Sequence, residues 1–317
     1  MEEHPKGRTD TMKTVTIGFS NMWGKAEDFT AEYMYRCFPL LRGHYDLQVK
    51  HASDAAYVFY SVYGYVQNPG TWPCIRILIS GEAGDHFEEG GKIAPGVCQR
   101  SFYHYGLTCA ADNQHPNHIF FPQPLLMLNL YNDGWQSLIR KPNDPWVEHK
   151  KYFCNFIYGN PYSLDRIDFM KMLSKYKRVE CAGLVEGNNY ALRGLPSYDK
   201  EGYGYKQVFQ SMCKFSIAFE NNYFPGYTTE KLSDPLVARS LPIYFGNPKV
   251  AEIFNPESYI NVADFDSWER AIDYIKEVDQ NPKMYEYYLN QPPFKNNEIP
   301  EKFSDSTYLA FFKRIFG

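Results

Sequence analysis

The chain has 317 residues, which is large for one domain and comfortable for two. Hydrophobic residues make up 44% of it and charged residues 22%, the balance of a soluble globular protein. Its formal net charge of −4 argues against a nucleic-acid partner, since binding along a phosphate backbone needs strong basicity.

The cysteines and the start of the chain both predict a cytoplasmic location. The seven cysteines are an odd number, lack C-x-x-C spacing and mostly stand beside apolar residues. Buried, reduced thiols are therefore expected, in place of disulfides or a zinc site. Residues 1–10 lack the apolar core of a signal peptide, and no apolar run approaches the ~20 residues that span a bilayer.

The first part of the chain alternates apolar runs with helix-like spacing. Short apolar runs predict buried strands over residues 15–19, 56–60 and 75–79. A helix is expected over residues 26–38. Residues 84–123 are irregular and rich in Gly, Pro, His and Asn, with 118–121 as a further strand candidate. Buried strands that alternate with helices favour a parallel sheet.

A polar stretch with two prolines, residues 135–148, predicts a linker before a more regular second half. Strands are expected over residues 151–157, 178–182, 215–219, 241–246 and 259–262. Helices are expected over residues 166–176, 229–239 and 266–278, and a Gly/Asn-rich loop runs to residue 204. This alternation predicts an α/β protein whose site lies in loops after strand carboxyl ends.

Two local features leave alternatives open. Pro235 lies past the first turn of the helix expected from Thr229, so it should kink that helix or delay its start. Residues 308–317 are aromatic and basic. A terminal helix docked on the body is the favoured interpretation of this tail, and weak contact with a membrane surface is the alternative.

The most informative stretch, residues 219–231, reads FENNYFPGYTTEK and joins a predicted strand to a predicted helix. A helix start suits an anion, because free backbone N–H groups and the helix dipole both point there. Lys231 adds a positive charge, and Tyr227 and Asn221 add directional hydrogen bonds. On these residues alone, Glu230 and Lys231 also fit an ordinary helix start with solvated charges.

This stretch, with the strand LPIYFG that follows it, closely resembles the signature of the α1,3/α1,4-fucosyltransferases, glycosyltransferase family 10. That family moves fucose from GDP-fucose onto GlcNAc-containing sugars. Segments GFSNMWG, SGE and NPYSLDR extend the resemblance over residues 15–275. It implies a GT-B architecture with two Rossmann-like domains across a cleft, here residues 1–148 for the acceptor and 149–317 for GDP-fucose. The last helix is a candidate to pack back on the first domain, and a soluble member of the bacterial type is expected.

The resemblance also implies roles for single residues. Glu82 follows a buried strand at the edge where open α/β sheets place ligands, and would be the general base. Arg166, at a helix start, would bind the diphosphate together with Tyr227 and Lys231. Glu230 would complement the helix dipole, contact sugar hydroxyls or stabilise an oxocarbenium-like charge in the transition state.

The remaining expectations concern asparagines, a structural glutamate and the absence of a metal. Asn221 would hydrogen-bond the nucleotide or order its loop, and Asn188 and Asn189 would approach the guanosine. Glu220 is expected to satisfy backbone N–H groups of its own loop. The D-x-D pattern at residues 264–266 could hold a divalent cation. However, capping-box spacing over residues 266–269 favours a helix cap, and no metal or cofactor is expected.

The leading hypothesis is an inverting, metal-independent α1,3-fucosyltransferase, with α1,4 linkage left open. Its substrates would be GDP-fucose and the GlcNAc of an N-acetyllactosamine-type glycan, with acceptor specificity in residues 84–123. A GT-B enzyme that uses another nucleotide sugar is one alternative, and donor screening would separate it. A glycan-binding protein without activity is the other, and glycan binding without GDP release would support it.

Overall fold

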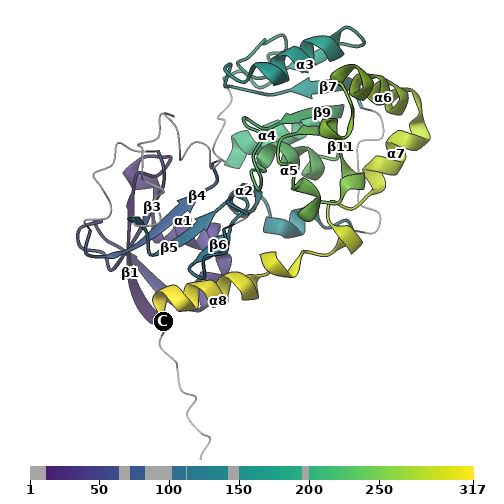
Figure 1. Ribbon diagram of the computed structural model, residues 1–317. Helices are drawn as coiled ribbons and strands as arrows, with labels where there is room; N and C mark the ends of the chain where they lie inside the picture. The colour runs from purple at the N-terminus through teal and green to yellow at the C-terminus, as the bar shows by residue number, and fades with distance from the viewer. Residues whose placement is uncertain (1–11, 64–71, 83–101, 112, 142–149, 195–199) are drawn as a thin grey trace, which may run out of the picture.

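The computed structural model describes residues 12–63, 72–82, 102–111, 113–141, 150–194 and 200–317. It has two parallel sheets with helices packed around them (Figure 1), which confirms the predicted α/β class. Sheet A has the strand order β2-β1-β3-β4-β5-β6, and sheet B has the order β11-β10-β9-β7-β8.

The strands and helices have the following bounds. Sheet A contains β1 (Lys13–Ser20), β2 (Tyr45–Val49), β3 (Tyr57–Tyr60), β4 (Ile75–Ser80), β5 (Tyr105–Thr108) and β6 (His118–Phe120). Sheet B contains β7 (Tyr152–Phe156), β8 (Val179–Cys181), β9 (Cys213–Phe219), β10 (Leu241–Phe245) and β11 (Ile260–Asn261). The α-helices are α1 (Ala31–Cys37), α2 (Gln123–Tyr131), α3 (Leu164–Ser174), α4 (Lys200–Ser211), α5 (Glu230–Val237), α6 (Trp268–Gln280), α7 (Pro282–Asn290) and α8 (Asp305–Phe316).

Most predicted strands are confirmed, and several element boundaries are corrected. The helix expected over residues 26–38 is a 3₁₀ turn, Ala26–Asp28, followed by α1, because Thr30 caps the Tyr33 N–H at 3.1 Å and starts a new helix. The loop expected to reach residue 204 ends earlier, where α4 begins. Strands β2 and β5 were not predicted.

The predicted linker begins too early. Residues Gly134–Leu138 form a 3₁₀ turn whose Trp135 and Leu138 side chains are buried in the core, so this stretch is part of the folded body. Residues 142–149, the rest of the predicted linker, lie outside the described residues.

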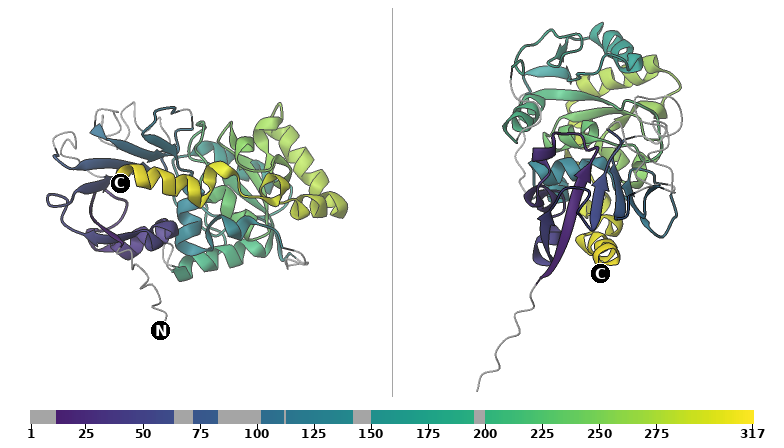
Figure 2. Two further views of the ribbon diagram at one scale, coloured as in Figure 1. Left: turned by 90° about the horizontal axis from the view of Figure 1, so that it is seen from below. Right: turned by 90° about the vertical axis from the view of Figure 1, so that its left-hand side faces the viewer.

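The C-terminal helix α8 packs on sheet A, where Figures 1 and 2 show it lying across the strands. Tyr308 donates its hydroxyl to the Phe120 carbonyl at 3.1 Å, and Lys13 of β1 donates to the Phe316 carbonyl at 2.5 Å. The apolar side chains of α8 are buried there, as the docked-helix interpretation of the tail predicts.

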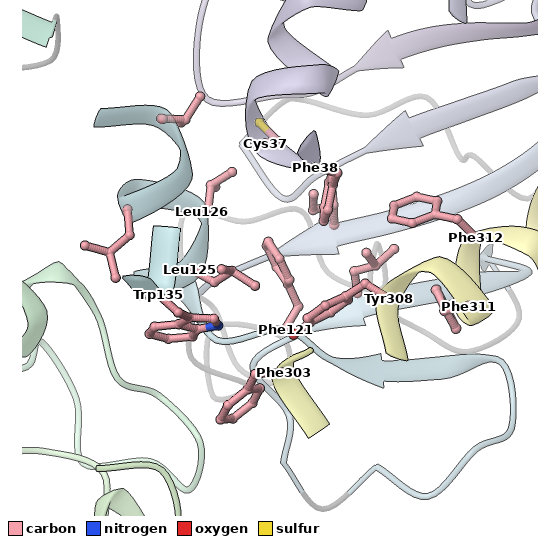
Figure 3. Close-up of a cluster of buried hydrophobic side chains, with 14 of the residues drawn as sticks. Cys37, Phe38, Phe121, Leu125, Leu126, Trp135, Phe303, Tyr308, Phe311 and Phe312 are labelled. Carbon is pink, nitrogen blue, oxygen red and sulfur yellow. The ribbon is translucent and has the colours of Figure 1, made fainter. Parts of the chain in front are cut away.

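One hydrophobic cluster extends from sheet A to α5 and the strands of sheet B, and a second cluster packs within the sheet B half. Figure 3 shows Phe121, Tyr308 and Trp135 in this cluster, between α2, α8 and the strands of sheet A. The Trp135 ring also lies 5.4 Å from the ring of Phe294, in the segment between α7 and α8. The two sheets are therefore joined by packed side chains as well as by the covalent chain.

Several smaller expectations can be compared with the structure. Among the described cysteines, most are buried, as predicted: Cys37, Cys109, Cys154, Cys181 and Cys213. Cys98 lies outside the described residues. No helix in the described ranges combines the length and the apolar character that crossing a bilayer requires.

Candidate functional site

The loop between β9 and α5 leaves the middle of sheet B, because β9 is its central strand. Thr229 caps α5, and its hydroxyl accepts a hydrogen bond from the Lys231 N–H at 3.3 Å. The helix therefore begins at Glu230, close to the predicted start. Pro235 lies inside α5 and does not delay its start, so of the two predicted effects the delay is excluded and a kink stays a prediction.

Glu220 is buried under this loop and holds it in shape. Its carboxylate accepts hydrogen bonds from the Thr229 N–H and the Thr229 hydroxyl, both at 2.7 Å. A side chain at Gly246 would overlap Glu220, which explains the glycine at the end of β10. The expected structural role of Glu220 is confirmed.

The same loop presses against sheet A at Gly226. This residue has a φ of +89°, and a side chain there would overlap the carbonyl oxygen of Cys109, just after β5. The Gly226 N–H donates to the Asn247 side-chain oxygen at 2.8 Å. Glycine at this position therefore lets the loop of one sheet touch the edge of the other.

Arg166, the third residue of α3, is fully buried beneath the loop. It donates to the Asn221 side-chain oxygen at 2.7 Å and to the Asn160 carbonyl at 2.5 Å, and its guanidinium lies 4.1 Å from the centre of the Tyr158 ring. Its Nε has no hydrogen-bond partner within the described part of the chain. Since an unsatisfied buried donor is costly, this group is suited to an anionic ligand.

Lys231 and Glu230 form a charged pair at the start of α5, with the Lys231 Nζ 3.8 Å from the Glu230 carboxylate and 3.4 Å from that of Glu220. Burial disfavours the charged form of Lys231. The negative charges of Glu230 and Glu220 outweigh this cost of burial and raise the pKa of the ammonium well above its usual value. Burial likewise disfavours the charged form of Glu230. The positive charges of Lys231 and Lys206 outweigh this cost and lower the pKa of the carboxyl to about 2. Both groups are charged at neutral pH.

Glu82 follows β4 and faces this cluster from sheet A. The Tyr63 hydroxyl donates to its carboxylate, and Cys109 donates its thiol to the Glu82 carbonyl at 2.8 Å. Burial raises the pKa of Tyr63, and the nearby carboxylates of Glu82 and Glu230 raise it further. Tyr63 therefore lies in the field of both acidic side chains, Glu82 after β4 and Glu230 at the start of α5.

Tyr227 completes the cluster from within the loop. It is buried, and its hydroxyl lies 3.5 Å from the Asn221 side-chain nitrogen. Burial raises the pKa of Tyr227, although Lys231 acts in the opposite direction. The structure thus brings together the predicted Arg166, Asn221, Tyr227, Glu230 and Lys231, with Glu82 opposite.

Asn188 and Asn189 lie at the edge strand β8, where their side chains bind the protein itself. The Asn188 side chain accepts from the Cys181 N–H at 2.9 Å and donates to the Val179 carbonyl at 3.0 Å. Asn189 donates to the Glu180 carboxylate at 2.9 Å. These bonds order the loop beside the edge strand, and a guanosine contact remains a prediction.

Gln123 was missed by sequence reasoning. It begins α2, next to sheet A, and its side-chain amide hydrogen-bonds both the backbone and the carboxylate of Glu230. Nothing in the sequence marks it, since it ends the irregular stretch 84–123 and its partner lies 107 residues further on.

The D-x-D pattern is part of a helix start. Ser267 caps α6 by accepting from the Arg270 N–H at 3.3 Å, so the cap is one residue later than the capping-box spacing places it. Asp264 accepts from the Asn261 side chain at 2.7 Å. Within the described ranges, no cluster of three or more His, Cys, Asp or Glu side chains is arranged to hold a metal ion.

A hollow of about 900 Å³ lies beside the carboxyl ends of β1 and β2. Its lining includes the aromatic side chains of Phe29 and Trp72 together with His51. The Trp23 ring lies 6.0 Å from that of Phe29 and 6.2 Å from that of Tyr63, so aromatic side chains connect the hollow to the partner of Glu82.

Residues 146–303 match the model of the C-terminal part of glycosyltransferase family 10, the fucosyltransferases. The chain belongs to glycosyltransferase family 10. It is 33% identical over 189 residues to the α-(1,3)-fucosyltransferase of Helicobacter pylori, covering 58% of this chain and 37% of that protein. It is 32% identical over 157 residues to a putative fucosyltransferase of Acanthamoeba polyphaga mimivirus, covering 49% of this chain and 26% of that protein.

The fold of this family 10 chain is also found in solved structures. It superposes on a crystal structure of α1,3-fucosyltransferase with GDP-fucose with a TM-score of 0.73 and 23% identity, over 99% of this chain and 94% of the other. The likeness shows a shared fold, the GT-B arrangement of two parallel-sheet domains. The chain spans less than two fifths of the length of the two curated relatives named above.

Proposed function

We propose that this chain is an inverting α1,3-fucosyltransferase that transfers L-fucose from GDP-fucose to the GlcNAc of an N-acetyllactosamine-type glycan. The observation that carries the proposal is the buried Arg166, which lies among the signature residues opposite Glu82 and whose Nε has no hydrogen-bond partner among the described residues. The names of the relatives in family 10 support the choice of sugar, and the solved structure with GDP-fucose supports the choice of donor.

The donor diphosphate would lie between Arg166, Tyr227, Lys231 and the start of α5. Both hydrogen-bond partners of Arg166 are neutral oxygens, so its charge is available to a phosphate. Lys231 stays protonated because two carboxylates surround it, and the backbone N–H groups at the start of α5 add a partial positive charge. These groups would stabilise GDP as it departs. We therefore assign no essential role to a divalent metal.

Glu82 and Glu230 would have different roles. Glu82 removes the proton from the acceptor hydroxyl while that oxygen bonds to C1 of fucose, and the C1–O bond to the diphosphate breaks with its electron pair leaving on GDP. A carboxyl with a pKa of about 2 is too weak a base for this step at neutral pH. Glu230 would instead remain an anion and stabilise the positive charge that develops on the sugar ring.

The acceptor would approach Glu82 from sheet A. The hollow beside β1 and β2 is large enough for a sugar unit, and its aromatic lining suits the apolar faces of sugar rings. The line of rings from Phe29 through Trp23 to Tyr63 leads from this hollow to Glu82. We place the acceptor there, and leave its linkage to product analysis.

Two substitutions test the division of roles. Glu82→Ala should abolish turnover with GDP-fucose and N-acetyllactosamine and leave the GDP Kd nearly unchanged, as measured by calorimetry. Arg166→Ala should weaken GDP binding by about 1.5–3 kcal/mol, roughly 10- to 150-fold, through loss of charge-assisted bonds. Arg270→Ala, on the exposed surface of α6, is the matched control and should change neither quantity.

The outcomes distinguish the alternatives. Turnover by Glu82→Ala within a few-fold of the wild type would refute the general-base assignment. Unchanged GDP affinity in Arg166→Ala would remove this residue from the donor site. Turnover with a different nucleotide sugar in place of GDP-fucose would leave the assignment of the donor site standing and would replace fucose as the transferred sugar.

A further inference from the structure

We propose that Gln123 is a positioning residue that holds Glu230 in its working orientation across the junction between the two sheets. The inference rests on the proposed function, because it concerns the residue to which we assign stabilisation of the sugar charge. It adds a residue that lies outside the family 10 signature stretch.

The contacts of Gln123 constrain Glu230 at two points. The Gln123 side-chain oxygen accepts from the Glu230 backbone N–H at 2.9 Å, and its side-chain nitrogen donates to the Glu230 carboxylate at 3.0 Å. A single planar amide thus binds the backbone and the side chain of the same residue. This pair of bonds favours one orientation of the Glu230 side chain.

Gln123 also touches the segment that carries Glu82. A Cβ atom at Gly81 would lie 2.7 Å from the Gln123 Cγ, so the glycine is what lets the Gln123 side chain pass there. Gly81 directly precedes Glu82. Gln123 therefore contacts both Glu230 and the turn before Glu82, and it sets how these carboxylates lie relative to each other.

The chemistry of the amide fits this task better than that of a charged side chain. Gln123 begins α2, a helix of nine residues without a capping side chain, so the positive ends of α2 and α5 both lie near Glu230. A neutral amide can orient the carboxylate without neutralising it. A glutamate here would lose the N–H donor and repel Glu230, and a lysine would cancel the charge that the reaction uses.

The chain offers a matched control at the other end of α2. Asn132, the residue after that helix, donates to the Gln207 side chain of α4 at 3.1 Å and accepts from it at 3.2 Å. This reciprocal pair also joins the α2 region to the helices of sheet B, but Asn132 does not hydrogen-bond Glu230. It therefore separates a general effect on the packing of the two halves from an effect on Glu230.

The test compares Gln123→Ala, Gln123→Glu and Asn132→Ala in fucosyl transfer. For both Gln123 variants we expect kcat to fall about 10- to 100-fold, since a misplaced catalytic group costs this much, while the GDP Kd stays within about threefold. Asn132→Ala should keep kcat within about threefold. Equal losses in Gln123→Ala and Asn132→Ala, or an unchanged kcat in Gln123→Ala, would overturn the proposal.

A second measurement keeps this proposal separate from the proposed function. In thermal unfolding, the double variant Gln123→Ala with Glu230→Ala should lose less Tm than the sum of the single variants, because each single variant removes the hydrogen bond between the two side chains. Additive losses would overturn the inferred contact even if fucosyl transfer is observed. Absence of fucosyl transfer by the wild type would refute the proposed function. The catalytic part of this inference would then fail too, even if the Tm losses of the Gln123 and Glu230 variants are not additive.

Discussion

Glu230 keeps its negative charge in a partly buried position because lysines surround it. Its side chain is 22% exposed, and the ammonium groups of Lys231 and Lys206 outweigh the cost of burial. The pKa of the Glu230 carboxyl falls from an ordinary 4.5 to about 2. A permanent anion beside a sugar site can stabilise positive charge without taking part in proton transfer.

This shift predicts how stability depends on pH. The folded-state pKa lies below the unfolded value, so the ionised carboxylate of Glu230 stabilises the fold fully above pH 4.5, and this contribution is lost as the pH falls towards 2. The contribution is on the order of 3 kcal/mol. Between pH 5 and pH 2, the wild type should therefore lose more unfolding free energy than Glu230→Gln, as measured by urea unfolding.

A surface substitution controls for the loss of charge alone. Glu277→Gln, on the exposed side of α6, should leave the pH dependence of the wild type unchanged. The same slope in Glu230→Gln and the wild type would contradict the account of the Glu230 charge.

Residues within one contiguous motif were predictable, and residues that meet across the fold were not. Glu220, Tyr227 and Lys231 stand in a short stretch that joins a predicted strand to a predicted helix. Gln123 meets Glu230 only because α2 and α5 are brought together by tertiary packing. Neither its residue type nor its neighbours in the sequence indicate that contact.

At the scale of elements, the β9–α5 loop depends on one glycine. Gly226 has a positive φ and lies against the backbone after β5, so a substitution there meets two separate costs. Gly194 also has a positive φ, +78°, but within the described ranges no atom beyond its chain neighbours lies within 4 Å of the place where its Cβ would stand. A comparison of substitutions at Gly194 and Gly226 can therefore separate the cost of backbone strain from the cost of a steric clash.

We expect Gly194→Ala to lower the unfolding free energy by about 1–2 kcal/mol, the cost of the left-handed conformation alone. Gly226→Ala should cost clearly more and should also weaken GDP binding, because the loop that carries Tyr227 must move. Denaturant unfolding and calorimetry measure both quantities. Equal destabilisation in the two variants would contradict the close contact between this loop and sheet A.

Strands with continuous apolar runs were predictable, and those shaped by packing were not. β2 lies at the edge of sheet A and has only two buried residues, Tyr45 and Leu47, and β5 contains Gly106. A Cβ at Gly106 would lie 3.0 Å from the Tyr103 ring, so packing accounts for a residue that strand propensity disfavours. The order of strands within each sheet also depends on contacts that no local pattern encodes.

At the scale of the whole molecule, α8 contributes to the core of sheet A from the far end of the chain. Phe316 is fully buried, with its ring 4.9 Å from that of Tyr57 and 5.2 Å from that of Tyr45. The sequence predicts an aromatic terminal helix. The family resemblance makes the first domain a candidate surface for this helix, but the individual strands that it covers could not be predicted, since the partners lie more than 250 residues away.

Phe316→Ala should lower the unfolding free energy by about 3–5 kcal/mol, the usual cost of removing a large buried ring. Because one hydrophobic cluster includes residues from both sheets, we expect a single cooperative transition that shifts as a whole in calorimetry. Lys313→Ala, exposed on the same helix, should have little effect. Separate transitions, of which only one shifts, would contradict a shared core.

The central claim is that this family 10 chain transfers fucose from GDP-fucose. The most direct test measures GDP release from GDP-fucose in EDTA, with and without N-acetyllactosamine, using the wild type and Glu82→Ala. The account predicts release that depends on the acceptor, persists in EDTA and disappears in Glu82→Ala. A wild-type chain that neither releases nor binds GDP would contradict the assignment of the β9–α5 loop and Arg166 as a donor site.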